Sequence, residues 1–235
     1  MYILHGACRD LKNQCDHALY YDVFLIWCLR HDVTCLQYDG QGFYLLKITH
    51  TIMVLLESQT KLQTGDIAPS FELLGVDDKT HTLSEYGKDG LLVIFMCNHC
   101  TYVKAKSDAL NELYDMFGEK IDIVGINSND PVGYPEDSLE NMKKTVEEKA
   151  FLFDYLVDGS QDVAKRYGAV CTPDPFLFDK DRRLVFHGRI DNAMKPGDVP
   201  TEKIIIINIQ KMLSGQKIEN DFDPSIGCSI KWKEN

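Results

Sequence analysis

The sequence predicts an α/β fold in which a central mixed β-sheet carries helices on both faces. Residues 90–96 and 121–127 are apolar runs with the length of buried strands, and a segment with helical periodicity follows the first. Two later apolar segments, 175–178 and 183–187, flank a polar turn, as in a β-hairpin. Parallel strands joined by crossover helices, followed by an antiparallel pair, form a mixed sheet covered on both faces.

Smaller elements precede the first long strand. Residues 71–74 alternate as a strand, and residues 80–83 form a second strand after the polar turn 76–79. We therefore expect a leading β-hairpin. Ser84 is expected to cap a helical turn that Gly87 ends.

The middle of the chain alternates helices and strands. Helical spacing from Thr101 predicts a helix whose apolar positions are Tyr102, Ala105, Ala109, Leu110, Leu113 and Phe117. A helix over about 137–149 follows a polar loop, with acidic residues at its start that suit the helix dipole. Residues 151–156 predict a short strand, and residues 161–167 a short helix that Gly168 ends.

The last expected element is a helix over 201–213, which ends before Gly215. Arg189 and Asp191 follow the last strand of the hairpin, and we expect them to form a turn-stabilising pair. From about residue 215 the chain is a polar tail in which Ile230 and Trp232 alternate as though docking on a surface.

Cys97 and Cys100 lie one helical turn apart, where the strand over 90–96 meets the helix that begins at Thr101. Unpaired backbone N–H groups and the helix dipole at such a junction stabilise a thiolate. We therefore predict a redox-active dithiol in which Cys97, with a lowered pKa, is the nucleophile. Cys100 would then resolve the mixed disulfide.

Metal binding is the alternative interpretation of these cysteines. A structural zinc site needs four ligands, whereas Cys171 and Cys228 lie singly and far apart in the sequence. Copper held by Cys97, Cys100 and a histidine such as His187 is a further option, because thiolates suit soft metals. The redox interpretation is favoured, and it requires no metal and no cofactor.

Composition limits the classes of partner. The chain has 235 residues, of which 44% are hydrophobic and 26% charged, as in a globular protein. Its formal charge of -11 argues against nucleic acid and anionic membranes as partners. We find neither an apolar run long enough to span a bilayer nor the layout of a signal peptide. The expected location is cytoplasmic, where eight cysteines imply transient or catalytic disulfides.

The first 52 residues differ from the rest of the chain. They contain half of the cysteines, and their apolar residues form short clusters without a clear period. We therefore expect two parts: an N-terminal extension over 1–52 and a domain over 60–235. One hypothesis is that Met53 is the true translation start, so that the extension is not part of the native protein or is poorly ordered. The alternative is a genuine N-terminal hairpin or helix that packs on the domain.

The dithiol, the Thr172-Pro173 pair before the late hairpin and the order of elements together resemble the thioredoxin fold. The similarity is to the peroxiredoxin-like subgroup of the AhpC/TSA (alkyl hydroperoxide reductase and thiol-specific antioxidant) family. It extends from about residue 60 to the C-terminus, and the segments that carry it are 65–71, 97–103, 125–130, 134–138, 171–174, 187–191 and 227–232. It implies a thioredoxin-like fold with an N-terminal β-hairpin and a helical insertion of peroxiredoxin type.

The resemblance also implies roles for residues around the dithiol. The proline that matches Pro173 is cis in thioredoxin-like proteins, and the residue before it, here Thr172, offers backbone groups to an extended substrate; an ordinary trans proline is the alternative. Cys171 would then be a third redox thiol near the dithiol, or else an inert buried cysteine. His99 would donate to a thiolate, or else face solvent as a loop histidine. Cys228 is either a resolving thiol or a structural one.

Departures from the family pattern shape the expected activity. Thr101 stands where the family usually has a proline. In the peroxiredoxin pattern Pro-x-x-x-Thr/Ser-x-x-Cys, aligned on Cys100, Val93 and Cys97 replace the proline and the hydroxyl residue. We therefore expect thiol-disulfide exchange with protein or small-molecule disulfides and a cellular dithiol reductant, with weak peroxide reduction and an antioxidant role. The alternative is a copper-binding or redox-sensing protein without turnover.

Overall fold

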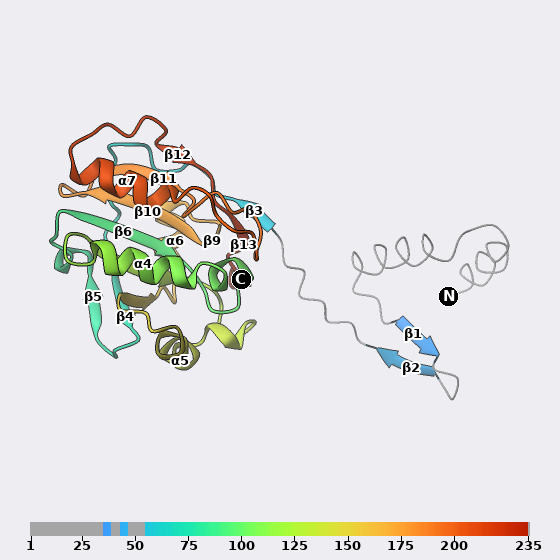
Figure 1. Cartoon of the computed structure of the whole chain (residues 1–235). Helices are drawn as coiled ribbons and strands as arrows, with labels where there is room; N and C mark the ends of the chain where they lie inside the picture. The colour runs from blue at the N-terminus through green and yellow to red at the C-terminus, as the bar shows by residue number, and fades with distance from the viewer. Residues whose placement is uncertain (1–34, 39–42, 47–54, 235) are drawn as a thin grey trace, which may run out of the picture. The chain divides into compact units, whose positions relative to one another are not determined.

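The computed structural model describes residues 35–38, 43–46 and 55–234 (Figure 1). The chain divides into two compact units, Met1–Met53 and Val54–Asn235. The described part of the first unit is an antiparallel pair of strands, β1 (Cys35–Tyr38) and β2 (Phe43–Leu46). The other residues of the extension lie outside the described part, and the hypothesis of a translation start at Met53 stays a prediction.

The second unit is built on an eight-stranded mixed sheet. Its strands are β4 (Glu72–Gly75), β5 (Thr80–Thr82), β6 (Gly90–Phe95), β7 (Asp122–Asn127), β8 (Asp154–Val157), β10 (Asp174–Asp179), β11 (Leu184–Gly188) and β12 (Phe222–Asp223). They follow the spatial order β12-β11-β10-β6-β7-β8-β4-β5 (Figure 1). The central strands β6, β7 and β8 are parallel, whereas β10 and β4 pair with them in the antiparallel sense. The predicted mixed sheet and both hairpins are confirmed.

Helices cover both faces of this sheet, as predicted. The helices of the second unit are α3 (Thr101–Lys104), α4 (Ser107–Phe117), α5 (Leu139–Lys149), α6 (Asp162–Tyr167) and α7 (Ile204–Leu213), with the 3-10 turns η1 (Leu83–Glu85) and η2 (Pro135–Asp137). Along β6, Leu92 and Ile94 pack with α4 and α7, whereas Leu91, Val93 and Phe95 pack on the opposite face with α6. The strand is therefore buried on both sides and leads its following loop into the interior.

The expected continuous helix from Thr101 is broken into α3 and α4. Lys106 leaves the helical conformation, with φ -103° and ψ 3°. Its ammonium group lies 2.5 Å from a carboxylate oxygen of Asp191 and also donates to the carbonyl of Ala193 at 3.3 Å. The break coincides with this long-range ion pair, which helical periodicity in the sequence does not reveal.

This ion pair also corrects the expected pairing of Arg189 with Asp191. The guanidinium of Arg189 instead lies 2.9 Å from the carboxylate of Asp223, which belongs to the edge strand β12. A smaller difference concerns η1, whose N-cap is Thr82 rather than Ser84. The hydroxyl and amide of Thr82 both donate to the side chain of Glu85.

A second sheet in this unit was not expected. Its three strands, β3 (Leu55–Glu57), β9 (Cys171–Thr172) and β13 (Ile226–Ser229), are arranged with β13 in the centre, antiparallel to both neighbours (Figure 1). The C-terminal segment is thus tied to the body of the domain. Ile230 is buried, whereas Trp232 is 41% exposed, so only one of the two alternating residues docks.

The described helices are short. The two longest, α4 and α5, have 11 residues each, and among the described residues no helix combines the length and the apolar composition that crossing a bilayer would require.

Candidate active site

The two cysteines lie where β6 ends and α3 begins, as predicted. Cys97 is 1% exposed, and Cys100 is fully buried and forms the N-cap of α3. The Sγ of Cys97 lies 3.3 Å from the Oγ1 of Thr172, and the Sγ of Cys100 donates to the carbonyl of Thr172 at 3.2 Å. The peptide bond between Thr172 and Pro173 is cis, which confirms the prediction made for it. The fold thus brings the dithiol and the Thr172-Pro173 pair together.

Cys228 joins this site. Its Sγ lies 2.8 Å from the Sγ of Cys100, and both side chains are buried. Cys171 is buried too, but it precedes Thr172 on β9, and side chains alternate between the two faces of a strand. Within residues 55–234 its sulfur makes no hydrogen bond to a thiol of the site. The thiol that the fold adds to the dithiol is therefore Cys228, not Cys171.

The backbone of Thr172 does not offer the free edge expected for a substrate. Thr172 pairs with Cys228, so β13 of the same chain already covers this edge. The close approach depends on Gly227, because a β-carbon at this position would lie 1.9 Å from the Thr172 carbonyl oxygen. Because Gly227 has no β-carbon, β13 can lie tightly against β9 at the residue before Cys228.

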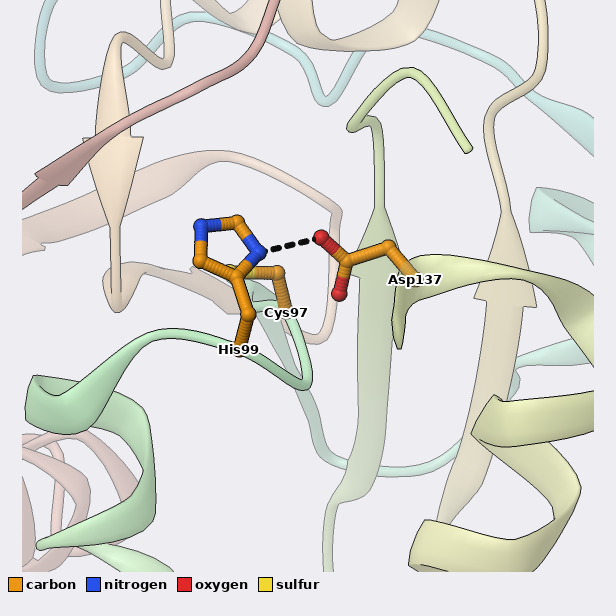
Figure 2. A group of neighbouring side chains, drawn as sticks. All are labelled: Cys97, His99 and Asp137. Atoms are coloured by element: carbon orange, nitrogen blue, oxygen red, sulfur yellow. Dashed lines mark hydrogen bonds and ion pairs between the residues drawn. The ribbon is translucent and has the colours of Figure 1, made fainter. Parts of the chain in front are cut away.

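His99 is oriented by a buried carboxylate and not by a thiolate (Figure 2). Its Nδ1 donates to Asp137 over 2.5 Å, and its ring stacks on Tyr134 with centroids 5.0 Å apart. Asp137 is buried on η2 and also accepts from the backbone N–H of Asn98 and from the Asn129 amide, at 2.7 and 2.8 Å. The expected donation to a thiolate and the solvent-facing alternative are both replaced by this His99–Asp137 pair.

Asp137 stays ionised in this environment. Burial opposes its charge, but the hydrogen bond and charge of His99, with the amides of Asn129 and Asn98, lower the pKa of Asp137 below its ordinary value. A buried negative charge therefore lies beside Cys97. From the sequence, Asp137 was expected only near the start of a helix. The one signal for a role in the site was its position in the segment 134–138, which resembles the family.

The two thiols differ in their acidity, in the opposite sense from the prediction. Burial raises the pKa of Cys97, and the hydrogen bond with Cys100 and the charge of Asp137 raise it further. Hydrogen bonds with Cys228 and then with Cys97 lower the pKa of Cys100. The physical reason is that burial and the nearby charge of Asp137 act on Cys97, whereas two neighbouring thiols form hydrogen bonds with Cys100, and none of these contacts entered the sequence analysis.

A cavity gives access to one side of the site. It has a volume of about 280 Å³ and lies between α3, α5 and the loop after β6. Cys97 is part of its wall and Cys100 is not; the charged residues of the wall are Lys104, Glu136, Lys144, Glu148 and Lys149. A molecule bound in the cavity would therefore meet Cys97 first.

The side chains that could hold a metal ion are not those expected from the sequence. Among the described residues, the group that brings potential ligand atoms together is Cys97, His99 and Asp137, whose atoms lie within 4.8 Å of one another (Figure 2). His187 instead lies 2.8 Å from Asp174 and stacks on Phe176. The copper site that combines His187 with both cysteines of the dithiol is therefore not assembled.

Comparison with known proteins identifies the family. Residues 64–187 match the model of the AhpC/TSA family. The chain belongs to this family. A thiol-disulfide oxidoreductase ResA of Geobacillus thermodenitrificans is 27% identical over 127 residues, which cover 54% of this chain and 69% of that protein. The ResA protein of Bacillus thuringiensis subsp. konkukian is 24% identical over 128 residues, covering 54% and 70%.

Comparison with solved structures supports the thioredoxin-like fold of this AhpC/TSA protein. An uncharacterized conserved protein of Geobacillus kaustophilus is 39% identical, with a TM-score of 0.74, covering 78% of this chain and 98% of that one. A hypothetical protein of Sinorhizobium meliloti 1021 is 37% identical, with a TM-score of 0.71, covering 76% and 99%. The thioredoxin domain of a Bacteroides vulgatus oxidoreductase shares the fold at 19% identity, with a TM-score of 0.51 over 65% of this chain and 99% of that one. The protein is a thioredoxin-like oxidoreductase.

Proposed function

We propose that this protein exchanges thiols and disulfides through Cys97 and Cys100. Cys97 attacks a disulfide of a protein or small molecule, which forms a mixed disulfide and releases one thiol. Cys100 then attacks the Sγ of Cys97, which forms the Cys97–Cys100 disulfide and releases the second thiol. A cellular dithiol would return the pair to the reduced state. The observation that carries the proposal is that Cys97 forms part of the cavity wall, whereas Cys100, at the helix N-cap, does not.

The acidities of the two thiols suit this order. Hydrogen bonds with Cys228 and with Cys97 lower the pKa of Cys100, which favours its deprotonation for attack on the mixed disulfide on Cys97. The raised pKa of Cys97 makes it a good nucleophile once it is deprotonated, but leaves little thiolate at neutral pH. We expect the first attack to be the slow step.

Trapping of the mixed disulfide tests the proposal. The Cys100→Ser variant, incubated with glutathione disulfide, should retain one glutathione on Cys97, because the resolving thiol is absent. Cys97→Ser should retain none at this site, and Cys171→Ser, which removes a buried thiol outside the dithiol, should behave as the wild type. Intact mass and peptide mapping give the readout. If Cys100→Ser never carries glutathione on Cys97, exchange at this residue is wrong.

Peroxide reduction is part of the proposal only as a slow side reaction. The hydroxyl nearest to Cys97 is that of Thr172, at 3.3 Å, so one hydrogen-bond donor is present for a peroxide. The raised pKa of Cys97 limits the thiolate that would attack. We therefore propose at most a minor antioxidant role, checked by peroxide consumption in wild type and Cys97→Ser. We also propose a cytoplasmic setting, which would keep the dithiol reduced between turnovers.

Metal binding is the second candidate, and the grouping of Cys97, His99 and Asp137 favours it. These nitrogen, oxygen and sulfur ligands suit zinc, with an open fourth position. Against it, His99 Nδ1 and Asp137 Oδ2 face each other across 2.5 Å and share a hydrogen bond. Purified protein that retains one equivalent of metal, and loses it in both Cys97→Ser and His99→Ala, would replace exchange by metal binding.

A further inference from the structure

The C-terminal strand brings a third sulfur into contact with the dithiol. Cys228 and Cys100 are 128 residues apart in the sequence, yet their Sγ atoms lie 2.8 Å apart. A disulfide bond measures about 2.05 Å, so only a small approach separates this pair from bonding distance. The Sγ of Cys97 lies 3.3 Å from the Oγ1 of Thr172, and the Sγ of Cys100 donates to the carbonyl of the same residue at 3.2 Å, so Thr172 holds both thiols of the dithiol beside the sulfur of Cys228.

The backbone holds Cys228 in this position. β13 pairs with β9 on one side and with β3 on the other (Figure 1). Within the pair of β13 and β9, Cys228 stands directly opposite Thr172. An extended peptide that adds a strand to a sheet edge is a common way of presenting side chains to a site. Here β13 takes that place beside the Thr172-Pro173 pair. The chain thus presents its own cysteine to Cys100 from the edge that was expected to receive a substrate.

We propose that Cys228 is a third redox thiol, which displaces Cys97 from the Cys97–Cys100 disulfide. The Sγ of Cys228 attacks the Sγ of Cys100. The Cys100–Cys228 bond forms, the Cys97–Cys100 bond breaks, and Cys97 leaves as a thiolate that takes up the proton lost by Cys228. The number of disulfides is unchanged, so the step needs no further oxidant. The inference rests on the proposed function, because exchange at Cys97 supplies the first disulfide.

This step separates reaction with the substrate, at Cys97, from storage of the disulfide, between Cys100 and Cys228. After the shift Cys97 is again a thiol in the wall of the cavity, while the two oxidising equivalents are held between buried sulfurs. Cys97 can therefore meet a new molecule before the protein has been reduced. Within the described residues the sulfur of Cys171 makes no hydrogen bond to a thiol of the site, and its side chain is buried like that of Cys228, which makes Cys171 the matched control.

The experiment follows the position of the disulfide in the full chain. Reduced protein receives one equivalent of glutathione disulfide, which supplies two electrons' worth of oxidation, and samples are quenched in acid at intervals. Free thiols are blocked with N-ethylmaleimide under denaturing conditions, and unreduced digests are mapped by mass spectrometry. Wild type, Cys228→Ser and Cys171→Ser are compared. The quantity measured is the fraction of Cys97 that is blocked in molecules that have lost two thiols.

We expect wild type and Cys171→Ser to yield a disulfide-linked Cys100–Cys228 peptide. In most of their molecules that have lost two thiols, Cys97 should carry N-ethylmaleimide. In Cys228→Ser, Cys97 should no longer react with N-ethylmaleimide in these molecules, because only the Cys97–Cys100 disulfide can form. Wild type that shows Cys97–Cys100 alone overturns this inference and leaves the proposed function intact. The mapping of wild type does not depend on how well any variant folds. Failure of the proposed function itself would show separately, as absence of glutathione on Cys97 in the trapping experiment with Cys100→Ser.

Discussion

Gly227 lies so close to the carbonyl oxygen of Thr172 that a β-carbon on this glycine would be 1.9 Å from that oxygen. No side chain can be accommodated at this distance unless β13 and β9 move apart. The pairing of β13 with β9 in turn determines where Cys228 lies, opposite Thr172 and against Cys100. The geometry of the sulfur cluster therefore depends on the absence of a side chain at residue 227.

The first prediction follows from this contact. Gly227→Ala should lower the free energy of unfolding by about 1–3 kcal/mol, the usual cost of inserting a methyl group into a packed site. The matched control is Gly87→Ala, since a β-carbon there meets nothing within 4 Å; its effect should stay within about 0.5 kcal/mol. Urea unfolding of both variants is the measurement. Equal stabilities of the two variants would contradict the close approach of β13 to β9.

The second prediction concerns the acidity of Cys97. In a Cys100→Ser background, Asp137→Asn should shift the pH midpoint of Cys97 alkylation downward, because a neighbouring negative charge that raises the pKa of Cys97 is removed. Alkylation should be followed by peptide mass spectrometry between pH 6 and 11. Glu136→Gln is the control, since it neutralises the adjacent but exposed carboxylate. A midpoint that moves equally in both variants would mean that Asp137 has no special effect on Cys97.

The third prediction is the pH dependence of stability at the His99–Asp137 pair. The pKa of Asp137 is lower in the folded protein than in the unfolded chain, so the folded state favours the carboxylate. Its stabilising contribution is then complete above the unfolded pKa of about 3.9 and is lost as the pH falls through the lower folded pKa. Asp137→Asn should therefore cost about 1–3 kcal/mol at pH 7, with a smaller difference from wild type below pH 4.

Urea unfolding of wild type and Asp137→Asn at pH 7, 5 and 3.5 measures this difference. His99→Ala should reproduce the loss at pH 7, because it removes the main hydrogen bond to the carboxylate. A difference between wild type and Asp137→Asn that grows as the pH falls would contradict the lowered pKa.

The sequence predicted those parts of the site that depend on local patterns. The strand that ends before Cys97 is apolar throughout because helices cover both faces of the sheet, and the helix after Cys100 shows a clear period. Cys97 and Cys100 lie between these elements, so their position could be predicted from their neighbours in the chain. The cis bond at Pro173 followed from the family resemblance.

The remaining parts of the site depend on contacts between distant segments. Cys228 lies in a segment that looks like a polar tail, and only pairing with β9 brings it to the dithiol. Asp137 resembles an ordinary acidic residue near a helix start until the fold buries it against His99. The acidity of Cys97 was predicted with the wrong sign for the same reason. Burial, the hydrogen bond with Cys100 and the charge of Asp137 raise the pKa of Cys97, and the contact with Asp137 has no local signature in the sequence.

The fourth prediction concerns the ion pair at the break between α3 and α4. Lys106 and Asp191 are both largely shielded, and their side chains are 13% and 4% exposed. Lys106→Met would leave a buried carboxylate without its cation, so it should cost about 3–5 kcal/mol. The double variant Lys106→Met/Asp191→Asn should recover part of this loss, because it also removes the uncompensated charge.

Lys203→Met is the control. Lys203 and its partner Glu112 have side chains that are 53% and 39% exposed, so the cost should stay below about 1 kcal/mol. Urea unfolding of Lys106→Met, Asp191→Asn and the double variant gives the coupling energy. If the variants at residues 106 and 203 lose equal stability, the Lys106–Asp191 pair does not act as a buried ion pair.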